Sequence, residues 1–517
     1  GMVVMTNSPR ARQARRINVQ FILSQHDCNC PTCIRSTNCE LQTIANDLGI
    51  ISQPYSKEVP EKKWDMNFPL IKDDSKCIKC MRCIQVCNKV QSIGVWGLDN
   101  TGSRTNIGVT CDREIDESDC VLCGQCVTHC PTGALSERDD TLKAFRALAD
   151  PDIITVVQIA PAVRAAWAED LGVSREFATV KRLVAALRKI GFNYIFDTDF
   201  GADLTIIEEG NEFMHWKFNN KEPNRYPLFT SCCPGWVRFM KSQYPDMIEH
   251  LSTTKSPQQM FGAVAKTYLA EILKVDPSRI FSVAIMPCTA KKAECTYPGM
   301  DSTGTGPDIN LVLTTRELSR MIVAEHIKAE NLTEEDFDQP MGISTGAGVI
   351  FGASGGVMEA ALRSVYFLAT GNNPDVEAFA NVRGMNGWRE ATFDIEGKPI
   401  RVAVASGLQN ARNLVEAIRN GEVRYDFVEV MACPGGCING GGQPINLDRE
   451  MAMARGQSLY GIDRKSSLRF SHENPSIEAM YEQFTGNKMV HKVHELLHTD
   501  HTGWEMPLAP RLQGKEC

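Results

Sequence analysis

The chain has 517 residues, a net charge of −8, 43% apolar residues and 23% charged residues, which is ordinary for a globular protein. No apolar run approaches the roughly 20 residues that cross a membrane, no secretory signal peptide is recognisable, and the acidic balance gives no sign of a nucleic-acid partner. We therefore expect a cytoplasmic protein of several domains that binds neither membranes nor nucleic acid.

Twenty cysteines are the most informative feature of the composition, and thirteen of them lie before residue 131. Disulfides are typical of small secreted domains, whereas these cysteines form tight C-x-x-C clusters in a long chain. Metal or iron–sulfur ligation is therefore favoured over disulfides. The uneven distribution predicts a cofactor-rich front followed by a large globular domain.

Residues 1–25 are expected to form a linker or a helix, and residues 26–68 a small metal-binding module. The module contains the spacing H-x3-C-x2-C-x5-C, formed by His26, Cys30, Cys33 and Cys39. A zinc site is one interpretation, because three cysteines with one histidine are a common zinc set. The ferredoxin-like pattern that follows favours a 4Fe–4S cluster with one imidazole ligand. Cys28 is an alternative ligand, although Cys30 fits the spacing better.

Residues 69–146 contain the spacing C-x2-C-x2-C-x3-C twice, which is typical of bacterial ferredoxins with two clusters. In that pattern the fourth cysteine of each run binds the other cluster. One 4Fe–4S cluster is therefore expected on Cys77, Cys80, Cys83 and Cys130. The other is expected on Cys120, Cys123, Cys126 and Cys87. A pair of zinc sites is the alternative, but zinc sites rarely show this spacing. With the module before them, these sites predict a wire of three relay clusters for single electrons.

Residues 147–455 alternate strand and helix patterns, which predicts an α/β domain with mostly parallel sheets. Helices are expected at 180–192 and 202–218, where apolar residues recur at helical spacing and the first helix ends at Gly191. Strands are expected in the apolar, β-branched segments 152–161, 193–198, 226–233, 279–288, 308–315, 401–407 and 426–433.

Three of these strands run directly into loops that contain cysteine. The loops carry Cys232 and Cys233, Cys288, and Cys433 followed by Cys437. Open α/β sheets bind ligands at the carboxyl ends of their strands, so the three loops can converge on one chamber. Adjacent side chains on an extended backbone point in different directions. Cys232 and Cys233 are therefore expected to have different roles, one in binding and one in chemistry.

The three loops resemble the signature motifs of iron–iron hydrogenases. The motifs are TSCCPGW (230–236), IMPCTAKKAE (285–294) and VMACPGGCINGGGQP (430–444). The resemblance extends through the ferredoxin-like front and covers nearly the whole chain from about residue 15. It is to monomeric clostridial-type members, without the N-terminal 2Fe–2S domain that many of them carry, and residues 456–517 resemble the small subunit of two-chain relatives. The resemblance implies an active site between two lobes of the α/β domain, preceded by small α+β iron–sulfur domains.

The active site of this family is the H-cluster, a 4Fe–4S cubane joined to a two-iron unit that carries carbon monoxide, cyanide and an azadithiolate. The resemblance implies that the cubane is bound by Cys233, Cys288, Cys433 and Cys437, with Cys437 as the bridge to the two-iron unit. Lys291 is expected to donate a hydrogen bond to a cyanide, although a surface lysine is the common alternative. Further cofactor contacts are expected from Ala160, Pro161, Gln258, Met286, Phe351 and Met431, of which the methionines and the phenylalanine would otherwise be ordinary core residues.

A proton path is also implied by the resemblance, and it runs through Cys232, Glu209, Ser252 and Glu212 to solvent. The two glutamates are three residues apart, so they share one face of the predicted helix; by themselves they would be read as a solvated face. Relatives often have an arginine one turn after the second glutamate. Here that position is Trp216, and Lys217 or Arg225 are possible substitutes.

The sequence therefore predicts a ferredoxin hydrogenase that interconverts hydrogen with protons and electrons, exchanging the electrons with a ferredoxin or flavodoxin-type carrier. Maturation proteins are expected as further partners, because they supply the two-iron unit in this family. Two alternatives stay open: a hydrogenase subunit of an electron-bifurcating complex that uses NADH and ferredoxin, and a non-catalytic sensor or assembly protein. The presence of Cys232, Lys291 and both glutamates favours catalysis.

Overall fold

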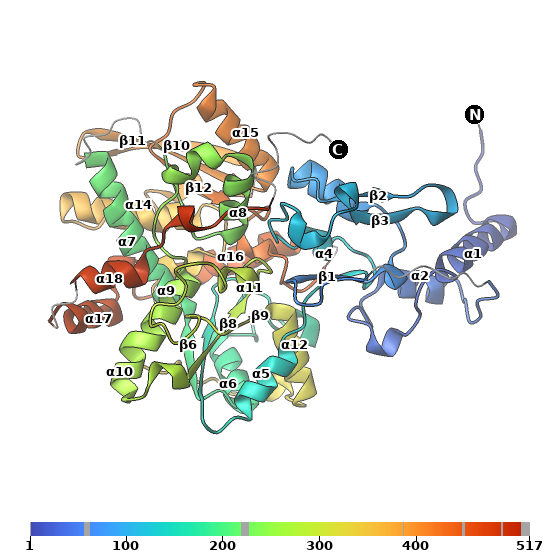
Figure 1. The fold of residues 1–517 in the computed structure, drawn as a ribbon, viewed down its shortest axis with the longest axis horizontal. Coiled ribbons are helices and arrows are strands. Elements are labelled where there is room, and N and C mark those ends of the chain that lie inside the picture. Colours follow the sequence, from blue (N-terminus) through green and yellow to red (C-terminus); the bar gives the residue numbers. More distant parts are fainter. Residues whose placement is uncertain are drawn as a thin grey trace.

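The computed structural model describes residues 2–55, 63–218, 227–385, 387–446, 450–486 and 490–507. Figure 1 shows the N-terminal elements gathered at one end of the molecule and two larger lobes, each built on a sheet, at the other. Within the described ranges, no helix combines the length and the apolar character of a membrane span.

The front is built from short elements around the cysteine runs. Its helices are α1 (Pro9–Leu23), α2 (Glu40–Asp47), α3 (Arg82–Gln85) and α4 (Gln125–Thr128). Its strands form two antiparallel pairs, β1 (Leu70–Lys72) with β4 (Leu135–Glu137) and β2 (Trp96–Asp99) with β3 (Asn106–Val109). Helices α3 and α4 occupy the same place in the two cysteine runs, and each follows a residue in left-handed conformation, Met81 or Gly124. The duplicated sequence therefore folds as a duplicated structure.

The first lobe is built on a sheet of strand order β6–β5–β8–β9, which is parallel throughout. Its strands are β5 (Ile154–Ile159), β6 (Tyr194–Asp197), β8 (Ile280–Met286) and β9 (Leu311–Thr314). Helices α5 (Thr141–Leu148), α6 (Val180–Ile190) and α12 (Thr315–Ala324) share the apolar core of this sheet. Helix α6 ends as the sequence predicts, because Gly191 adopts the left-handed conformation of a C-terminal cap.

The second lobe has strand order β10–β11–β12–β7 and is parallel except for the edge strand β10. Its strands are β7 (Leu228–Phe229), β10 (Trp388–Ile395), β11 (Lys398–Ser406) and β12 (Phe427–Met431). Helices α8 (Pro234–Gln243) and α15 (Leu408–Arg419) share one core with this sheet, and α14 (Gly356–Thr370) shares another. The two sheets confirm the predicted α/β fold, whereas the hairpin of β10 and β11 is not part of the prediction.

Helix α7 (Thr198–Phe218) connects the two lobes. Phe200 and Leu204 pack in one core with α9 (Pro257–Val264), while Ile206 and Phe213 pack in another core with α14. A helix that is apolar on opposite faces is buried inside the protein. Three acidic residues of this helix, Asp199, Asp203 and Glu209, are consequently held in the interior, whereas Glu208 and Glu212 are half-buried.

The C-terminal segment adds α16 (Glu450–Lys465), α17 (Pro475–Gly486) and α18 (Val490–Leu497). Leu459 of α16 packs with Val349 of α13 (Gly346–Ile350), and α18 shares a core with α9. The sequence places a domain boundary between residues 455 and 456. Helix α16 runs through that position as one helix.

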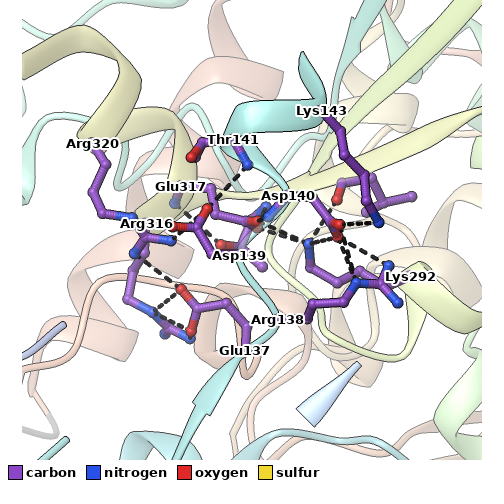
Figure 2. Close-up of polar contacts among 12 residues, drawn as sticks. Glu137, Arg138, Asp139, Asp140, Thr141, Lys143, Lys292, Arg316, Glu317 and Arg320 are labelled. Atoms are coloured by element: carbon purple, nitrogen blue, oxygen red, sulfur yellow. Dashed lines mark hydrogen bonds and ion pairs between the residues drawn. The ribbon is translucent and has the colours of Figure 1, made fainter. Parts of the chain in front are cut away.

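Buried ion pairs fasten the front to the first lobe, as Figure 2 shows. The fully buried ammonium of Lys292 donates to Asp140 Oδ2 (2.8 Å) and to Glu317 Oε1 (2.9 Å). The backbone N–H of Asp140 also donates to Glu317 Oε1, at 2.7 Å. Burial alone would raise the pKa of Asp140, but the charge of Lys292 and the surrounding hydrogen bonds outweigh it and lower that pKa. These contacts join the start of α5 to α12 and to the loop after β8.

A second set of contacts extends the same network to the loop that follows Cys437. Arg316 of α12 pairs with Glu137 of β4, with Nε 3.1 Å from Oε2. The same guanidinium donates to Gln443 O (2.5 Å) and Gly441 O (2.7 Å). Burial by itself would raise the pKa of Glu137, but the charge and hydrogen bonds of Arg316 outweigh it and lower the pKa to about 2. Arg316 thus connects strand β4 of the N-terminal part to the loop that follows Cys437.

We predict that Glu137→Gln destabilises the protein, because it leaves the buried guanidinium of Arg316 and the half-buried one of Arg320 without their carboxylate. Breaking a buried ion pair by removing one partner costs about 3–5 kcal/mol. Since the pKa of Glu137 is lowered on folding, this stabilisation is complete above pH 4.5 and is lost as the pH falls toward 2. The measurement is anaerobic denaturant unfolding at pH 7, followed by tryptophan fluorescence.

The matched control is Asp336→Asn, which removes an ion pair with Lys181 that is largely exposed. The control is expected to leave the unfolding midpoint unchanged. Equal midpoints for Glu137→Gln and the control would show that the buried network contributes nothing to stability.

Candidate functional site

Cysteines from the ends of three strands surround one small cavity between the lobes. Strands β7, β8 and β12 each end shortly before a cysteine loop. The cavity has a volume of about 70 Å³, and its lining includes the four cysteines Cys232, Cys233, Cys288 and Cys437. Cys433 does not line the cavity. It lies close enough to Cys288, Cys233 and Cys437 for thiolates at those positions to raise its pKa. The fold therefore brings together the four thiols expected on a cubane, with Cys232 beside them.

The remaining residues expected around the cofactor line the same cavity. They are Ala160, Pro161, Gln258, Met286, Lys291, Phe351 and Met431. They come from both lobes, since the first two follow β5 and Met431 ends β12. The cavity is therefore closed by side chains that lie far apart in the sequence and meet only where the strand ends face each other.

The donor chemistry of the four thiols fits an iron–sulfur cubane. Burial raises the pKa of Cys233 and raises that of Cys288 to about 11. Burial and the neighbouring thiolates raise the pKa of Cys433 and Cys437 still further. Without a metal these thiols are neutral, whereas coordination to a cation deprotonates them. All four are free of disulfides, so they are available as cluster ligands.

Glycines allow the loop around Cys437 to approach the other cysteine loops. Gly436 has φ +96°, a conformation that other residues adopt only with strain. A Cβ atom at Gly440 would lie 2.1 Å from the backbone oxygen of Pro287, which cannot yield. The loop therefore packs backbone against backbone on the loop of Cys288, and this contact sets the position of Cys437.

Lys291 begins the short helix α11 (Lys291–Glu294) and is almost fully buried. Its ammonium donates to Glu294 Oε2 at 2.9 Å and to the backbone oxygen of Cys232 at 3.1 Å. Burial would lower the pKa of Lys291, but the charge of Glu294 outweighs it and raises the pKa. The ammonium is therefore held charged at the cavity wall. Glu294 was not identified from the sequence, although its position three residues after the lysine on a helix is the signal that could have found it.

Gln258 of α9 offers an unused polar atom beside the cavity. Its side-chain nitrogen donates to Glu294 Oε2 at 3.1 Å. Among the described residues, its side-chain oxygen has no hydrogen-bond partner although it is buried. Buried polar atoms without a partner are rare and usually belong to a site that binds something. Gln258 and Lys291 therefore supply polar groups that fit a cofactor with hydrogen-bonding ligands.

Glu209 lies in the middle of α7 and is fully buried. Within the described part of the chain, neither of its carboxyl oxygens has a hydrogen-bond partner in the structure. Burial, followed by the nearby charge of Glu212, raises the pKa of Glu209 to about 8. A carboxyl group with this pKa gains and loses a proton near neutral pH, as a proton carrier must.

Cys232 lies between the cavity and Glu209. Burial raises its pKa well above the usual value, and the charge of Glu209 raises it further. The thiol is therefore the protonated member of the pair and Glu209 the more acidic one. Its backbone oxygen accepts a hydrogen bond from Lys291 at 3.1 Å.

The outer end of the expected path is well connected. Ser252 donates to Glu212 Oε2 at 2.6 Å, and its hydroxyl also lies 2.7 Å from that of Thr254. The position of the arginine of relatives is held by Trp216, which is buried and whose indole does not titrate. Of the two expected substitutes, Lys217 donates to Asp426 at 2.7 Å and is less suitable as a proton carrier. Arg225 lies outside the described residues.

The front brings together both predicted sets of ferredoxin cysteines. A cavity of about 20 Å³ is lined by Cys77, Cys80, Cys83 and Cys130. The second set lies close enough together for its thiolates to raise the pKa of Cys123 and Cys126. That set is Cys87, Cys120, Cys123 and Cys126. The fourth cysteine of each run thus lies with the other run, as the ferredoxin spacing predicts.

The second ferredoxin set lies directly against the cavity loops. Thr289, next to Cys288, donates to Leu122 O at 2.6 Å, and Gln125 donates to Asn439 O at 2.9 Å. A Cβ atom at Gly441 would lie 2.5 Å from Cys123 O, so the two backbones are in contact. The loop of this set is therefore in direct backbone contact with the loop that carries Cys437.

His26 and its cysteines lie on the far side of the ferredoxin-like domain. The backbone N–H of Asp27 donates to Ser75 O at 2.8 Å, and a Cβ atom at Gly133 would lie 2.7 Å from Cys33 Sγ. Within the described ranges, the buried Nδ1 of His26 has no hydrogen-bond partner. Burial lowers the pKa of His26 and keeps the imidazole neutral, the form that binds metals. Cys28 is exposed, unlike the partly buried Cys30.

Across the part of the chain that the structure describes, no three His, Cys, Asp or Glu side chains converge closely enough to hold a single metal ion. A 4Fe–4S cubane spaces its ligands more widely than one ion does, because each ligand binds a different iron.

Four family models match the chain. Residues 153–441 match the C-terminal domain of the iron only hydrogenase large subunit, and residues 449–504 match the iron hydrogenase small subunit. Residues 15–54 match the NADH-ubiquinone oxidoreductase-G iron-sulfur binding region, and residues 76–134 match the 4Fe-4S dicluster domain. Matches to the large and the small subunit therefore occur within one chain.

Curated relatives and a solved structure agree with these matches. The chain is 46% identical to the NADP-reducing hydrogenase subunit HndD of Solidesulfovibrio fructosivorans, over 96% of this chain and 86% of that protein. It is 39% identical to iron hydrogenase 1 of Clostridium pasteurianum, over 96% and 87%. A variant of the apo FeFe-hydrogenase HydA1 from Chlamydomonas reinhardtii superposes with a TM-score of 0.64 at 41% identity, over 71% of this chain and 99% of that one. Cytosolic iron-sulfur assembly component 3 of Mus musculus is 28% identical over 76% of this chain.

The different surroundings of the two adjacent cysteines predict different effects of the same substitution. Cys232→Ser is expected to keep iron content and the infrared bands of carbon monoxide, but to lower hydrogen turnover about a hundredfold or more, because a hydroxyl is a poor proton carrier. Cys233→Ser is expected to disturb the cubane and to lose iron. Iron analysis, infrared spectroscopy and gas chromatography of both matured variants check this. If both variants lose iron equally, Cys232 is a structural residue.

Proposed function

The chain belongs to the iron–iron hydrogenase family, and we propose that it catalyses the reversible oxidation of hydrogen to protons and electrons. The observation that carries this proposal is the position of Cys232 and Glu209. Cys232 lines the cavity beside three of the cubane-type thiols, as a proton donor. Glu209, a proton carrier with a pKa of about 8, lies close enough for its charge to raise the pKa of Cys232. A site that only stores or senses a cluster has no need of a titrating group in this place.

The residues fit the H-cluster, with Cys233, Cys288, Cys433 and Cys437 as ligands and Cys437 as the bridge. When bound, the two-iron unit supplies the metal at which hydrogen is formed or split. Lys291 is proposed to donate a hydrogen bond to one of its ligands, and Gln258 to contact it with an oxygen that can accept a hydrogen bond. Ala160, Pro161, Met286, Phe351 and Met431 are proposed to exclude water around it. The charge of Lys291 is already stabilised by Glu294, so it is available to orient an anionic ligand.

The proposed proton path runs through Cys232, Glu209, Ser252 and Glu212, and the hydrogen bond between the last two supports it. Cys232 holds a proton at the cavity, Glu209 exchanges it, and Ser252 passes it to Glu212 over a hydrogen bond of 2.6 Å. Serine relays a proton by donating one while accepting another. Because the packed chamber excludes bulk water, each of these carriers is needed in every turnover.

Three 4Fe–4S relay clusters are proposed for the electrons. The set Cys120, Cys123, Cys126 and Cys87 is the nearest to the active site, since its loop touches the loops of Cys288 and Cys437. The set Cys77, Cys80, Cys83 and Cys130 comes next. The outermost cluster is proposed on His26, Cys30, Cys33 and Cys39, and the buried free Nδ1 of His26 supports it.

A ferredoxin or flavodoxin-type protein is the proposed electron partner, together with maturation proteins that deliver the two-iron unit. A second candidate is a subunit of a complex that uses nicotinamide cofactors, because one relative with 46% identity is an NADP-reducing hydrogenase subunit. The assembly-protein alternative is weaker, since the relative that carries that name is only 28% identical. A cytoplasmic location and the division 1–25, 26–68, 69–146, 147–455 and 456–517 complete the proposal.

Iron analysis of fully matured protein is expected to give about 18 irons per chain, four in each of four 4Fe–4S units and two in the two-iron unit. A His26→Ala variant is expected to lose about four of these irons and no others, because only the outermost cluster depends on the imidazole. Zinc in the wild-type protein, or an unchanged iron count in the variant, would contradict a third relay cluster.

Hydrogen evolution from reduced ferredoxin tests the function and the electron partner together. The matured chain alone is expected to evolve hydrogen with reduced ferredoxin and to show infrared bands of carbon monoxide and cyanide. It is expected to give no turnover with NADPH alone, because the cluster modules supply no nicotinamide site. A chain that carries these infrared bands and still makes no hydrogen with either donor would contradict the proposed activity.

A further inference from the structure

The proton path as far as Glu212 leaves its last step open. Trp216, one turn further along α7, does not titrate, and Lys217 is turned toward Asp426. Protons must nevertheless leave Glu212 and be replaced once per transfer. A group that can accept and release a proton is therefore needed close to Glu212.

A continuous series of polar atoms leads from Glu212 into the C-terminal segment. The hydroxyl of Thr253 lies 3.2 Å from Glu212 Oε1, and its other neighbour is His498 Nδ1 at 2.8 Å. The opposite ring nitrogen, His498 Nε2, lies 3.2 Å from Glu208 Oε2. A hydroxyl and an imidazole can each accept a proton at one position while donating at another. The three groups are thus arranged as proton carriers in series.

The position of His498 is fixed by its backbone. His498 forms a β-bridge with Thr254, and the flanking contacts Lys255 N to Leu497 O (2.8 Å) and Thr499 N to Thr253 O (2.7 Å) set the register. Leu497 and the apolar face of α18 are buried in the same core as α9. The imidazole is therefore held against the proton path by the fold and does not meet it through a loose tail.

His498 also has a route to solvent. Its ring stacks on that of His494, which is exposed, with 4.1 Å between the centroids. Its partner Glu208 is only partly buried and accepts a hydrogen bond from Tyr481. The imidazole accordingly stands between an interior carrier, Glu212 through Thr253, and groups at the surface.

We propose that His498 is the exit carrier of the proton path, exchanging protons with Glu212 through the hydroxyl of Thr253. The proposal rests on the proposed hydrogenase activity and adds the C-terminal segment to the catalytic machinery. In the outward direction Thr253 gives its proton to Nδ1 while it takes one from Glu212, and Nε2 releases its proton to Glu208 or water. Each transfer breaks one bond to hydrogen and forms one, so no oxidant or reductant is involved.

Two independent variants of the matured full chain test whether His498 is the exit carrier. His498→Ala removes the carrier, and Thr253→Val removes the hydroxyl that connects it to Glu212. Both are expected to lower hydrogen turnover at least tenfold with unchanged infrared bands, because the cofactor lies at the other end of the path. Imidazole added to the buffer is expected to restore much of the turnover of His498→Ala, and the solvent deuterium isotope effect is expected to rise in both variants.

The controls make the same chemical changes elsewhere. His472→Ala removes a half-buried histidine that contacts Ser364 and Asn373, and Thr267→Val removes a hydroxyl that donates to Ala263 O. Both controls are expected to keep wild-type turnover and the wild-type isotope effect.

Turnover of His498→Ala and Thr253→Val within twofold of the wild type would overturn the proposal, and Glu212 would then exchange protons directly with water. Loss of turnover that imidazole does not restore, with altered infrared bands, would also overturn it in favour of a structural role. Absence of hydrogen turnover in the matured wild-type chain would overturn the proposed function itself, which separates the two failures.

Discussion

Exclusion of water from the chamber between the two lobes is the constraint on which the rest of the structure depends. The chamber is lined by strand-end loops and apolar side chains, and the groups around it are almost fully buried. Burial keeps the thiols of the candidate cubane site neutral until a cation binds them, and it raises the pKa of Glu209 to about 8. The same burial means that a proton cannot reach the site unless side chains carry it. The proton path that we propose follows from this burial.

The chamber keeps its shape because charged groups around it are paired. Lys292 binds Asp140 and Glu317, and Arg316 joins Glu137 to the loop that follows Cys437. These residues surround the active-site loops without lining the cavity. They connect the front to the first lobe, so the ferredoxin cysteines and the cavity cysteines are held in one frame (Figure 2). Such a frame suits electron transfer, which needs a fixed and short separation and no contact with water.

The sequence predicted the features that depend on local spacing. Both ferredoxin sets, the strand-end cysteines and the residues around the cavity could be named because each motif is short and specific. The α/β fold and helix α6 followed from periodicity. Strand β10 was missed although its sequence carries a strand signal, since Ala391, Phe393 and Ile395 alternate with exposed polar residues. Glu294, the ion pairs of Lys292 and the contact of His498 with Thr253 were missed for another reason. Most of them join segments that are distant in the sequence, and no local pattern records which buried charges will meet.

The most direct measurement of this account is the protonation state of Glu209 in the matured protein. Infrared difference spectra across a pH titration report the carboxyl stretch of a buried glutamic acid, and Glu209→Gln identifies which band belongs to this residue. The dry chamber predicts a protonated Glu209 at pH 6 that loses its proton with a midpoint near 8. A Glu209 that is already ionised at pH 6 would contradict the account, because the carboxyl would then be solvated and the chamber would not exclude water.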